Sequence, residues 1–453
     1  MSDRSKRMKT YQDYLKINER EKMNFVRSVI DQHKGTELYK TAIIADEYYR
    51  QENRTIMQYR KLLYTITGKA VPDNYSANYK TASGYFGRFV TQQNQYLLGN
   101  GITWQEDTTA DRLGIDFDAR VQEAGRLALI GGVAFGFWNY DHLEVFGVNE
   151  FAPLYDEENG ALRAGVRFWQ IDSTKPLRAT FYEEDGYTDY IWISGKGKEL
   201  QPMKTYIEKV ASSAIDGVMI YDGENYPTFP IVPLWANQQK ESELIGIRPE
   251  IDAYDLIKSG FANDLDDASQ IYWTISNAGG MDDVDLVKFI ERMKTVKASV
   301  VEDDGAKAEA HTMEVPYNAR EALLDRLRKD LYDDYMALDT KDIANGAVTA
   351  TQIKAAYEPM ETKANQYEFC VKDFLQGVLE IIGIKDSPTF TRTRIINANE
   401  EIQTILMAAQ YLDDEYVTTK ILTLLGDGDK AEEVLEKMDM ADFERFTGGD
   451  ESE

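Results

Sequence analysis

Two stretches with a helical repeat, separated by about forty residues, place the strongest constraint on how this chain can fold. In each stretch large apolar residues recur every three or four positions, and Pro249 stands at the start of the first. The members are Ile251, Tyr254, Ile257, Phe261, Leu265, Ala268, Tyr272 and Ile275, and then Leu323, Leu327, Leu331, Tyr335 and Leu338. We therefore predict two long helices, over 249–276 and 318–338, that flank a compact insert. At 1.5 Å per residue each helix would be roughly 30–40 Å long.

Acidic residues occupy the other faces of these two helices. They are Asp252, Asp255, Asp264, Asp266 and Asp267 in the first helix, and Asp333 and Asp334 in the second. One interpretation is an ordinary helical hairpin capped by a small subdomain. The other is a pair of struts that pack on neighbours along one face and turn the acidic face to a solvent-filled space.

The region from 131 to 235 is typical of antiparallel strands and hairpins. Short runs of aromatic and β-branched residues alternate there with Gly, Asp, Asn or Pro clusters. We predict strands over 133–140, 166–171, 180–182, 190–193 and 218–221. The dipeptides Asp185-Gly186 and Asp222-Gly223 favour tight turns, and the prolines at 230 and 233 favour an extended end.

Helices are predicted elsewhere, which makes the fold class α+β and mainly helical. The first fifty residues, with a stop at Gly35, and the segments 78–98 and 118–130 have amphipathic patterns. A long helix over 349–382 is expected to bend or break near Pro359. The insert contains a strand-like run at 298–301 and an acidic turn at 302–305. Two further helices and a disordered acidic tail are predicted after residue 388.

Composition narrows the possible functions. The chain has 453 residues, enough for about three structural units, and a formal net charge of −27. Tight binding of nucleic acid needs many Lys and Arg contacts to phosphate, which this charge opposes. A single cysteine, Cys370, excludes an internal disulfide and a cysteine-rich zinc site. Without a signal peptide or a membrane-spanning run, we expect a soluble protein from a reducing compartment.

Signals for catalysis are weak, so we predict no enzyme, no cofactor and no metal. The run 131–136 is rich in glycine but lacks the Lys and Ser/Thr of a phosphate-binding loop. The acidic cluster at 282–285 does not match a calcium-binding loop, and Cys370 lies in the apolar register of a helix. His142 and His311 are expected to be ordinary surface or packing residues. The enzymatic alternative is a metal-dependent hydrolase that uses acids near Asp266 and Asp283.

Three stretches, in order along the chain, carry a resemblance to a known family. The first runs from Asn78-Tyr79-Lys80 through Gly84 and Phe89 to Tyr96-Leu97-Leu98-Gly99-Asn100-Gly101-Ile102. The second comprises Phe229-Pro230-Ile231-Val232-Pro233-Leu234-Trp235-Ala236-Asn237, Glu241-Ser242-Glu243-Leu244, Ile251-Asp252-Ala253-Tyr254-Asp255 and Ser259. The third comprises Asn345-Gly346-Ala347, Ile353-Lys354-Ala355-Ala356-Tyr357 and Glu361-Thr362-Lys363-Ala364. Together they resemble the phage portal proteins of the SPP1 Gp6-like group, although Asn100-Gly101 and 348–351 depart from the usual pattern.

The resemblance implies a portal-type fold with wing, stem, clip and crown that assembles into a ring around a central channel. Residues 1–245 would form the N-terminal part of the wing, 246–276 and 318–338 the two stem helices, and 277–317 the clip. The channel loop would be 339–351, the long wing helix 349–388, and the crown with its acidic tail 389–453.

The resemblance also implies a role and partners. The ring, of twelve subunits in most relatives, would occupy one capsid vertex of a tailed phage, after assembly in the cytoplasm of the bacterial host. Double-stranded DNA would be packaged and ejected through it without sequence specificity and without contact with a membrane. The terminase large subunit and then a head–tail adaptor would dock on the clip, and the major capsid protein and a scaffold would contact the ring. A different head component, such as a minor capsid protein or a connector, is the nearest alternative.

Candidate residues follow from this mapping. The candidates for the channel loop are Lys341, Asp342, Asn345, Val348 and Thr349, with Lys341 or Asn345 as transient DNA contacts. The candidates for docking on the clip are Asp282, Asp283, Glu302, Asp303 and Asp304. The acidic stem faces would repel a passing polyanion, because a channel must let DNA slide.

Overall fold

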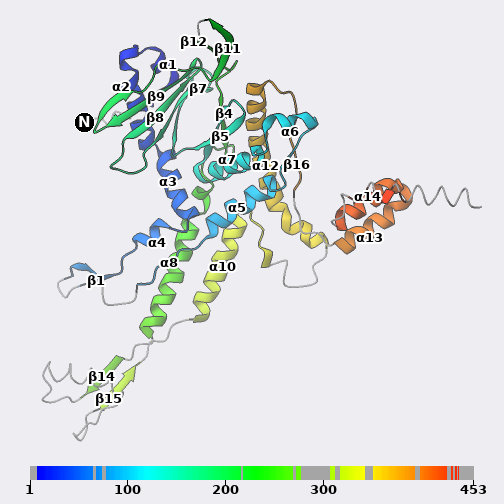
Figure 1. Ribbon diagram of the computed structural model, residues 1–453. Helices are drawn as coiled ribbons and strands as arrows, with labels where there is room; N and C mark the ends of the chain where they lie inside the picture. Colours follow the sequence, from blue (N-terminus) through cyan, green and yellow to red (C-terminus); the bar gives the residue numbers. More distant parts are fainter. Residues whose placement is uncertain are drawn as a thin grey trace, which may run out of the picture.

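The computed structural model describes residues 8–64, 68–73, 78–215, 218–268, 272–276, 307–311, 317–341, 350–392 and 398–425, together with 430, 431, 434, 435 and 437. The described chain has a two-sheet body, a long helical hairpin that leaves the body, a small β-hairpin arm beside it, and a separate pair of helices near the C-terminus (Figure 1). None of the described helices is long and apolar enough to cross a membrane.

A five-stranded antiparallel sheet forms one end of the body. Its strand order is β10-β9-β8-β7-β6, with β6 (Phe151–Tyr155), β7 (Leu162–Trp169), β8 (Leu177–Glu183), β9 (Gly186–Ile193) and β10 (Lys196–Glu199). Helix α2 (Glu19–Gly35) covers it, and Phe25, Val26 and Ile30 pack against Val166, Phe181 and other buried strand residues. The short helix α1 (Tyr11–Leu15) precedes α2, and β11 (Ile207–Ile215) pairs with β12 (Val218–Glu224) in a separate ribbon.

The centre of the body is a three-stranded sheet surrounded by helices. Its order is β13-β4-β5, with β4 (Val133–Asn139), β5 (His142–Gly147) and β13 (Ile231–Trp235). The largest apolar core lies between this sheet and α3 (Glu37–Tyr49), α5 (Tyr85–Leu98), α7 (Phe117–Gly131) and α12 (Ala350–Ile382). The strands β3 (Ile102–Thr103) and β16 (Thr389–Phe390) and the helix α6 (Asp107–Leu113) complete the body.

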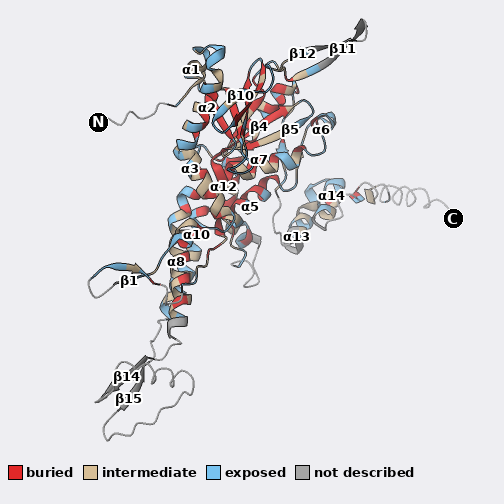
Figure 2. Ribbon diagram, turned by 60° about the vertical axis from the view of Figure 1, so that its left-hand side comes forward, coloured by how far each residue is buried: buried red, intermediate tan, exposed pale blue. Residues whose placement is uncertain are grey.

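The helical hairpin consists of α8 (Leu244–Ala268) and α10 (Tyr317–Tyr335), which run side by side away from the body (Figures 1 and 2). Beyond them β14 (Tyr272–Ser276) pairs antiparallel with β15 (Lys307–His311). The predicted helix over 249–276 is therefore wrong at both ends. The β-forming sequence Tyr272-Trp273-Thr274-Ile275 makes a strand, and Ser242 Oγ accepts from Leu244 N–H at 3.2 Å, so the helix begins before Pro249.

Most other predicted elements are confirmed. Helix α2 ends at Gly35, the five predicted strands correspond to β4, β7, β8, β9 and β12, and α12 covers the predicted long helix. One prediction fails, because Asp222-Gly223 lies within β12, opposite Lys209 and Glu208, rather than in a turn. α12 is one continuous helix through Pro359, so the predicted interruption is absent, whereas the predicted bend stays a prediction. The predicted strand at 298–301 and the terminal tail lie outside the described residues.

Two small parts project from the rest. The helix α4 (Arg54–Gln58) leads into β1 (Leu62–Tyr64) and β2 (Ala70–Pro72), a two-stranded hairpin beside α8 (Figure 1). The helices α13 (Ala398–Ala408) and α14 (Asp414–Leu425), joined through the short 3₁₀ helix η1 (Ala409–Tyr411), are the two predicted C-terminal helices. Figure 2 shows that buried residues concentrate in the body, whereas these parts are mainly exposed.

Candidate functional site

The acidic residues in the first half of α8 face the body of the chain. Asp255 is fully buried and accepts hydrogen bonds from the Ser83 backbone N–H, at 2.9 Å, and from the Asn53 side-chain amide. Burial raises the pKa of Asp255, and these hydrogen bonds only partly oppose that effect. Asp252 accepts a hydrogen bond of 2.9 Å from the Thr55 hydroxyl. The prediction that Asp252 and Asp255 face a solvent-filled space is therefore wrong, because both acids hold the body onto the hairpin.

The next acid on α8 joins the two helices of the hairpin. Asp264 lies 2.5 Å from an Arg320 guanidinium nitrogen of α10, with both side chains about one-third exposed. Asp264 therefore links α8 to α10 and is not part of an unpaired acidic surface. The side chains of Asp266 and Asp267 lie outside the described residues.

The outward side of α10 has both signs of charge. Asp333 and Asp334 are exposed, as expected, but Arg326 and Lys329 are exposed on the same helix. Arg326 is engaged within α10, where its Nε lies 2.8 Å from Asp330. The described part of the hairpin therefore does not present a continuous acidic face.

Two carboxyl groups meet where the hairpin joins the body. Glu250 of α8 shares a hydrogen bond with Asp334 of α10, and Asp330 lies close enough to add repulsion. Burial, this hydrogen bond and the two neighbouring negative charges together raise the pKa of Glu250 to about 7. One of the two carboxyl groups therefore holds a proton under mildly acidic conditions.

The chain that leaves α10 is fixed by side chains from the body. Gln92 of α5 donates through Nε2 to the Leu338 carbonyl at 3.0 Å and accepts from the Leu338 N–H at 3.1 Å. Arg328 pairs with Asp339, which in turn accepts from the Lys341 N–H at 3.1 Å. Lys341 itself is exposed. The predicted channel loop therefore starts from a position defined by two amide contacts and an ion pair.

The start of α12 packs against the same place. Its inward residues form a small apolar cluster with α5 and with Leu338. The buried members are Tyr96, Leu338, Ile353, Tyr357, Met360 and Ala364. This cluster brings the residues before and after 342–349 together on one helix. We call it, together with the Gln92 contacts, the loop anchor.

A buried ion pair adjoins the loop anchor. Lys363 Nζ lies 2.6 Å from Glu243 Oε2, donates to the Tyr335 carbonyl at 3.0 Å, and stands 3.4 Å from the centre of the Tyr335 ring. Burial lowers the pKa of Lys363, although Glu243 opposes that effect. The Tyr335 hydroxyl donates to Gln93 of α5 at 2.7 Å. A cavity of about 200 Å³ opens beside the pair and is bounded in part by Asn237 and Met336.

The three stretches singled out in the sequence thus converge. Tyr96 of the first stretch, Glu243 of the second and Lys363 of the third all lie at the loop anchor or in the ion pair beside it. Gln92 was not predicted. The signal available for it was a run of polar residues, 91–95, in an amphipathic helix, which does not reveal a backbone partner more than two hundred residues away.

The remaining candidates lie outside the described residues. They are Asp342, Asn345, Val348 and Thr349 of the loop and Asp282, Asp283, Glu302, Asp303 and Asp304 of the insert. The described part of the chain contains no group of three or more His, Cys, Asp or Glu side chains arranged to hold a metal ion.

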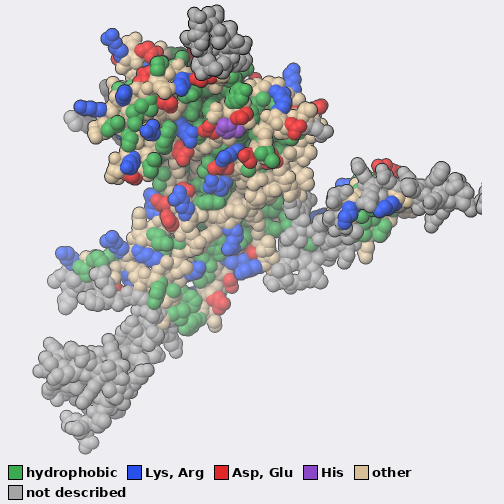
Figure 3. Space-filling model, viewed as in Figure 1, with side chains coloured by type: hydrophobic (Ala, Val, Ile, Leu, Met, Phe, Trp, Pro, Cys, Tyr) green, Lys and Arg blue, Asp and Glu red, His purple; other side chains and the backbone are tan. Residues whose placement is uncertain are grey.

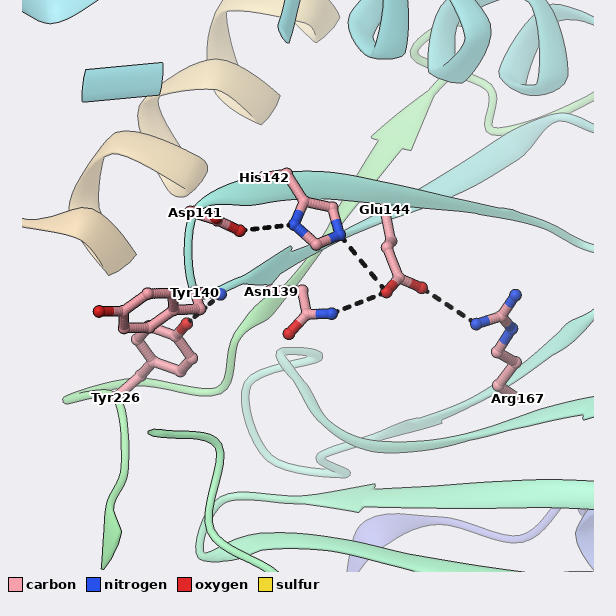
Figure 4. A network of polar contacts seen from close by, with 7 residues as sticks. All are labelled: Asn139, Tyr140, Asp141, His142, Glu144, Arg167 and Tyr226. Carbon is pink, nitrogen blue, oxygen red and sulfur yellow. Dashed lines mark hydrogen bonds and ion pairs between the residues drawn. The ribbon is translucent and has the colours of Figure 1, made fainter. Parts of the chain in front are cut away.

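A second polar network lies at the β4–β5 turn, in the body (Figure 4). His142 Nδ1 is 2.7 Å from Asp141, which lowers the pKa of that exposed carboxyl group, and Nε2 is 3.7 Å from Glu144. Glu144 also accepts from Asn139 at 2.8 Å and from Arg167 at 3.0 Å. The Glu144 carboxylate therefore joins β5 to β4 and β7, and we interpret the network as a structural contact between strands.

Comparison with known families shows which family the chain belongs to. A family model described as phage portal protein, SPP1 Gp6-like, matches residues 29–442. The chain belongs to this family. Its membership confirms the predicted resemblance and makes the chain a structural, non-enzymatic virion component, which removes the hydrolase alternative.

Two portal proteins illustrate the relationship. The chain is 27% identical to the portal protein of Clostridium phage phiCD119 over 57% of its own length and 58% of that protein. It is 24% identical to the portal protein of Bacillus phage SPP1 over 84% of its own length and 79% of that protein. The chain therefore spans a little over half of the first relative's length.

Solved structures of gene transfer agent particles are also similar in part. One chain from the neck of an empty particle, computed with C6 symmetry, has 12% identity and a TM-score of 0.44, and the match covers 76% of this chain and 90% of that one. A chain from the neck of a native particle, computed with C12 symmetry, has 11% identity and a TM-score of 0.42 over 74% and 89%. Neither likeness is strong enough to define the fold.

Proposed function

We propose that this portal family member is the subunit of a ring whose axial channel conducts double-stranded DNA at one capsid vertex. Residues 339–351 form the loop that faces the DNA, and the α8–α10 hairpin forms the stem. The terminase large subunit, and later a head–tail adaptor, dock on the clip at 277–317. The wing contacts the major capsid protein.

The loop anchor is the observation that carries this proposal. Gln92, Arg328 and the cluster around Tyr357 hold the residues on both sides of 342–349 against α5 and α10. A segment that touches moving DNA must be able to move at its tip but must be fixed at its base. A loop that is free at its base would be carried along by the polymer. The first and third family-like stretches contribute to that base, and the second contributes Glu243 of the ion pair beside it.

The charge distribution supports passage of DNA rather than tight binding. The formal net charge of −27 opposes the many Lys and Arg contacts to phosphate that tight binding needs. The acids of the first half of α8 do not contribute to a repulsive lining, since they face the body.

The proposal is tested by assembling phage particles with altered loops. Lys341→Ala is expected to reduce the amount of DNA retained per particle, because it removes an exposed cation at the base of the loop. Lys354→Ala, on the first turns of α12, is the matched control for loss of one positive charge. If the Lys341 variant packages and retains as much DNA as the parent, the assignment of 339–351 as the loop that faces the DNA is contradicted. If the purified chain never forms a ring with a central hole, the proposal that it forms a channel for DNA is contradicted.

A further inference from the structure

The arm, which we define by the described residues 59–64, 68–73 and 78–80, is fixed beside α8. Asn263 of α8 accepts a hydrogen bond from the Tyr79 N–H at 2.6 Å, and Ser259 accepts one from the Thr81 N–H at 3.0 Å. From that base the strands β1 and β2 extend away from α8 in both ribbon views (Figures 1 and 2). The arm therefore has a defined position but covers little of its own chain.

The described part of the arm cannot bury its apolar side chains by itself. Its two strands contribute three residues each, paired as Leu62↔Pro72 through Tyr64↔Ala70, and no third strand among the described residues joins them. An isolated two-stranded hairpin is at best marginally stable in water, and its open edges favour pairing with another chain. Tyr59 and Leu62 are 45% and 49% exposed. The arm thus has the surface of a segment that is completed by a protein partner.

The charge of the arm is opposite to that of the chain. Four basic residues, Arg60, Lys61, Lys69 and Lys80, stand against one acid, Asp73, in a chain whose net charge is −27. Figure 3 shows Lys and Arg side chains next to apolar ones along the arm. A basic segment on an acidic protein is complementary to the surface of another copy of the same protein.

A complementary surface lies on the opposite flank of the hairpin. The arm is on one side of α8 and α10 is on the other (Figure 1). Arg320 and Arg328 of α10 are engaged with Asp264 and Asp339, which leaves a net negative outward side. Asp330 pairs with Arg326 and Asp334 with Glu250, so the remaining outward charges are Glu321, Asp325 and Asp333 against Lys329. That side also exposes Leu323, at 46%.

We propose that the arm of each copy docks on the outward side of α10 of the next copy around the ring. This inference rests on the proposed ring, since a closed cyclic assembly needs two different surfaces on opposite flanks of each subunit. Arg60 and its basic neighbours lie against Asp333, while Tyr59 and Leu62 cover Leu323. Contact with DNA phosphates would use the basic residues but would leave the apolar side chains of the arm exposed, so a second copy is the better occupant.

Removal of the arm tip is the direct test. The Asp73 N–H donates to the Lys61 carbonyl at 2.9 Å, so an Asn-Gly turn can replace residues 62–72 without disturbing the base. We expect the shortened full-length chain to keep the circular dichroism spectrum of the parent and to lose ring formation in native mass spectrometry. Rings that form equally well without the tip would overturn this inference and leave the proposed function intact. Parent chains that never form rings would remove both.

A charge exchange tests the orientation of the contact. Arg60→Glu and Asp333→Lys are each expected to weaken association by roughly 1.5- to 5-fold at low salt, the range measured for exposed ion pairs, and more when repeated around a ring. The double variant Arg60→Glu with Asp333→Lys is expected to recover the parent affinity, because it restores opposite charges. A double variant as weak as the sum of the single variants would overturn the pairing. An Arg60→Glu variant that assembles normally but loses affinity for a short DNA duplex would identify the arm as a nucleic-acid contact instead.

Discussion

The body and the hairpin of this chain differ in how completely they bury their apolar residues. In the body, Phe374 and Leu379 of α12 and Phe89 of α5 are almost inaccessible, and aromatic rings contact one another throughout the core. In the distal hairpin, Leu323 is almost half exposed and Tyr317 slightly more. The body buries its apolar side chains within the single chain. The distal hairpin leaves apolar side chains exposed, which is typical of a surface that contacts another subunit.

The largest predicted effect is a difference in the free energy of unfolding between two variants, each with one side chain shortened to Ala, one in the body and one in the hairpin. Phe374→Ala in the core should lower the free energy of unfolding of the unassembled chain by about 3–5 kcal/mol, because it leaves a cavity against Gly136. Leu323→Ala on α10 should lower it by less than about 0.5 kcal/mol, since the side chain is exposed. Urea denaturation of both variants measures the difference. Equal losses would show that the hairpin is as closely packed as the body.

A smaller effect is expected at the junction of the two regions. Lys363→Met leaves Glu243 largely buried without its partner, and we expect a loss of about 2–4 kcal/mol. Lys372→Met is the matched control, because its pair with Glu368 is more exposed. The same denaturation measurement applies. A loss for Lys363→Met no larger than the control would mean that the ion pair does not hold the junction together.

The next effect concerns the loop anchor. Gln92→Leu removes both amide contacts to Leu338 and should cost about 1–3 kcal/mol, since a backbone N–H and carbonyl lose their partners. Limited proteolysis followed by mass spectrometry should then show faster cleavage within 339–351. Gln95→Leu, on a more exposed side of α5, serves as the control. Cleavage rates that match between the two variants would contradict the anchoring role of Gln92.

The smallest effect is a pH dependence at Glu250. Its pKa is raised to about 7, so its contribution to stability is complete below about pH 4.5 and is lost as the pH rises through 7. Glu250→Gln should therefore flatten the fall in the free energy of unfolding between pH 5 and pH 8, as measured by urea denaturation at each pH. The change should be less than about 1 kcal/mol, because the group is partly exposed. Glu321→Gln, on the exposed side of α10, is the control. Parallel pH profiles for the parent and Glu250→Gln would contradict the carboxyl pairing with Asp334.

Local patterns in the sequence predicted most elements of the fold. Alternating aromatic and β-branched residues marked the strands, and the repeat from Ile251 to Leu265 marked the inner part of α8. The same repeat failed at Tyr272 and Ile275, because spacing of three or four cannot separate a helix from a strand when the residues themselves favour strands. Pro359 was expected to bend or break α12. The helix is unbroken there and packs against α5 and β13, whereas the bend stays a prediction.

The candidate site was predictable only where its signal was local. The family-like stretches contained Tyr96, Glu243 and Lys363, but nothing in their spacing indicated that they meet. The acids of α8 were expected on a solvent-facing surface because helical periodicity assigns a face without identifying what lies against it. Asp255 is buried by the segment around Asn53 and Ser83, which is about two hundred residues away along the chain. Long-range partners of this kind require the three-dimensional structure.

The central claim is that the chain forms a ring whose channel is faced by the loop held at the anchor. Electron cryomicroscopy of the assembled full-length protein tests it most directly. The account predicts a closed ring of 51.7 kDa subunits with residues 342–349 at the narrowest part of the central hole. A ring in which that segment lies away from the hole, or an assembly without a hole, would contradict the account.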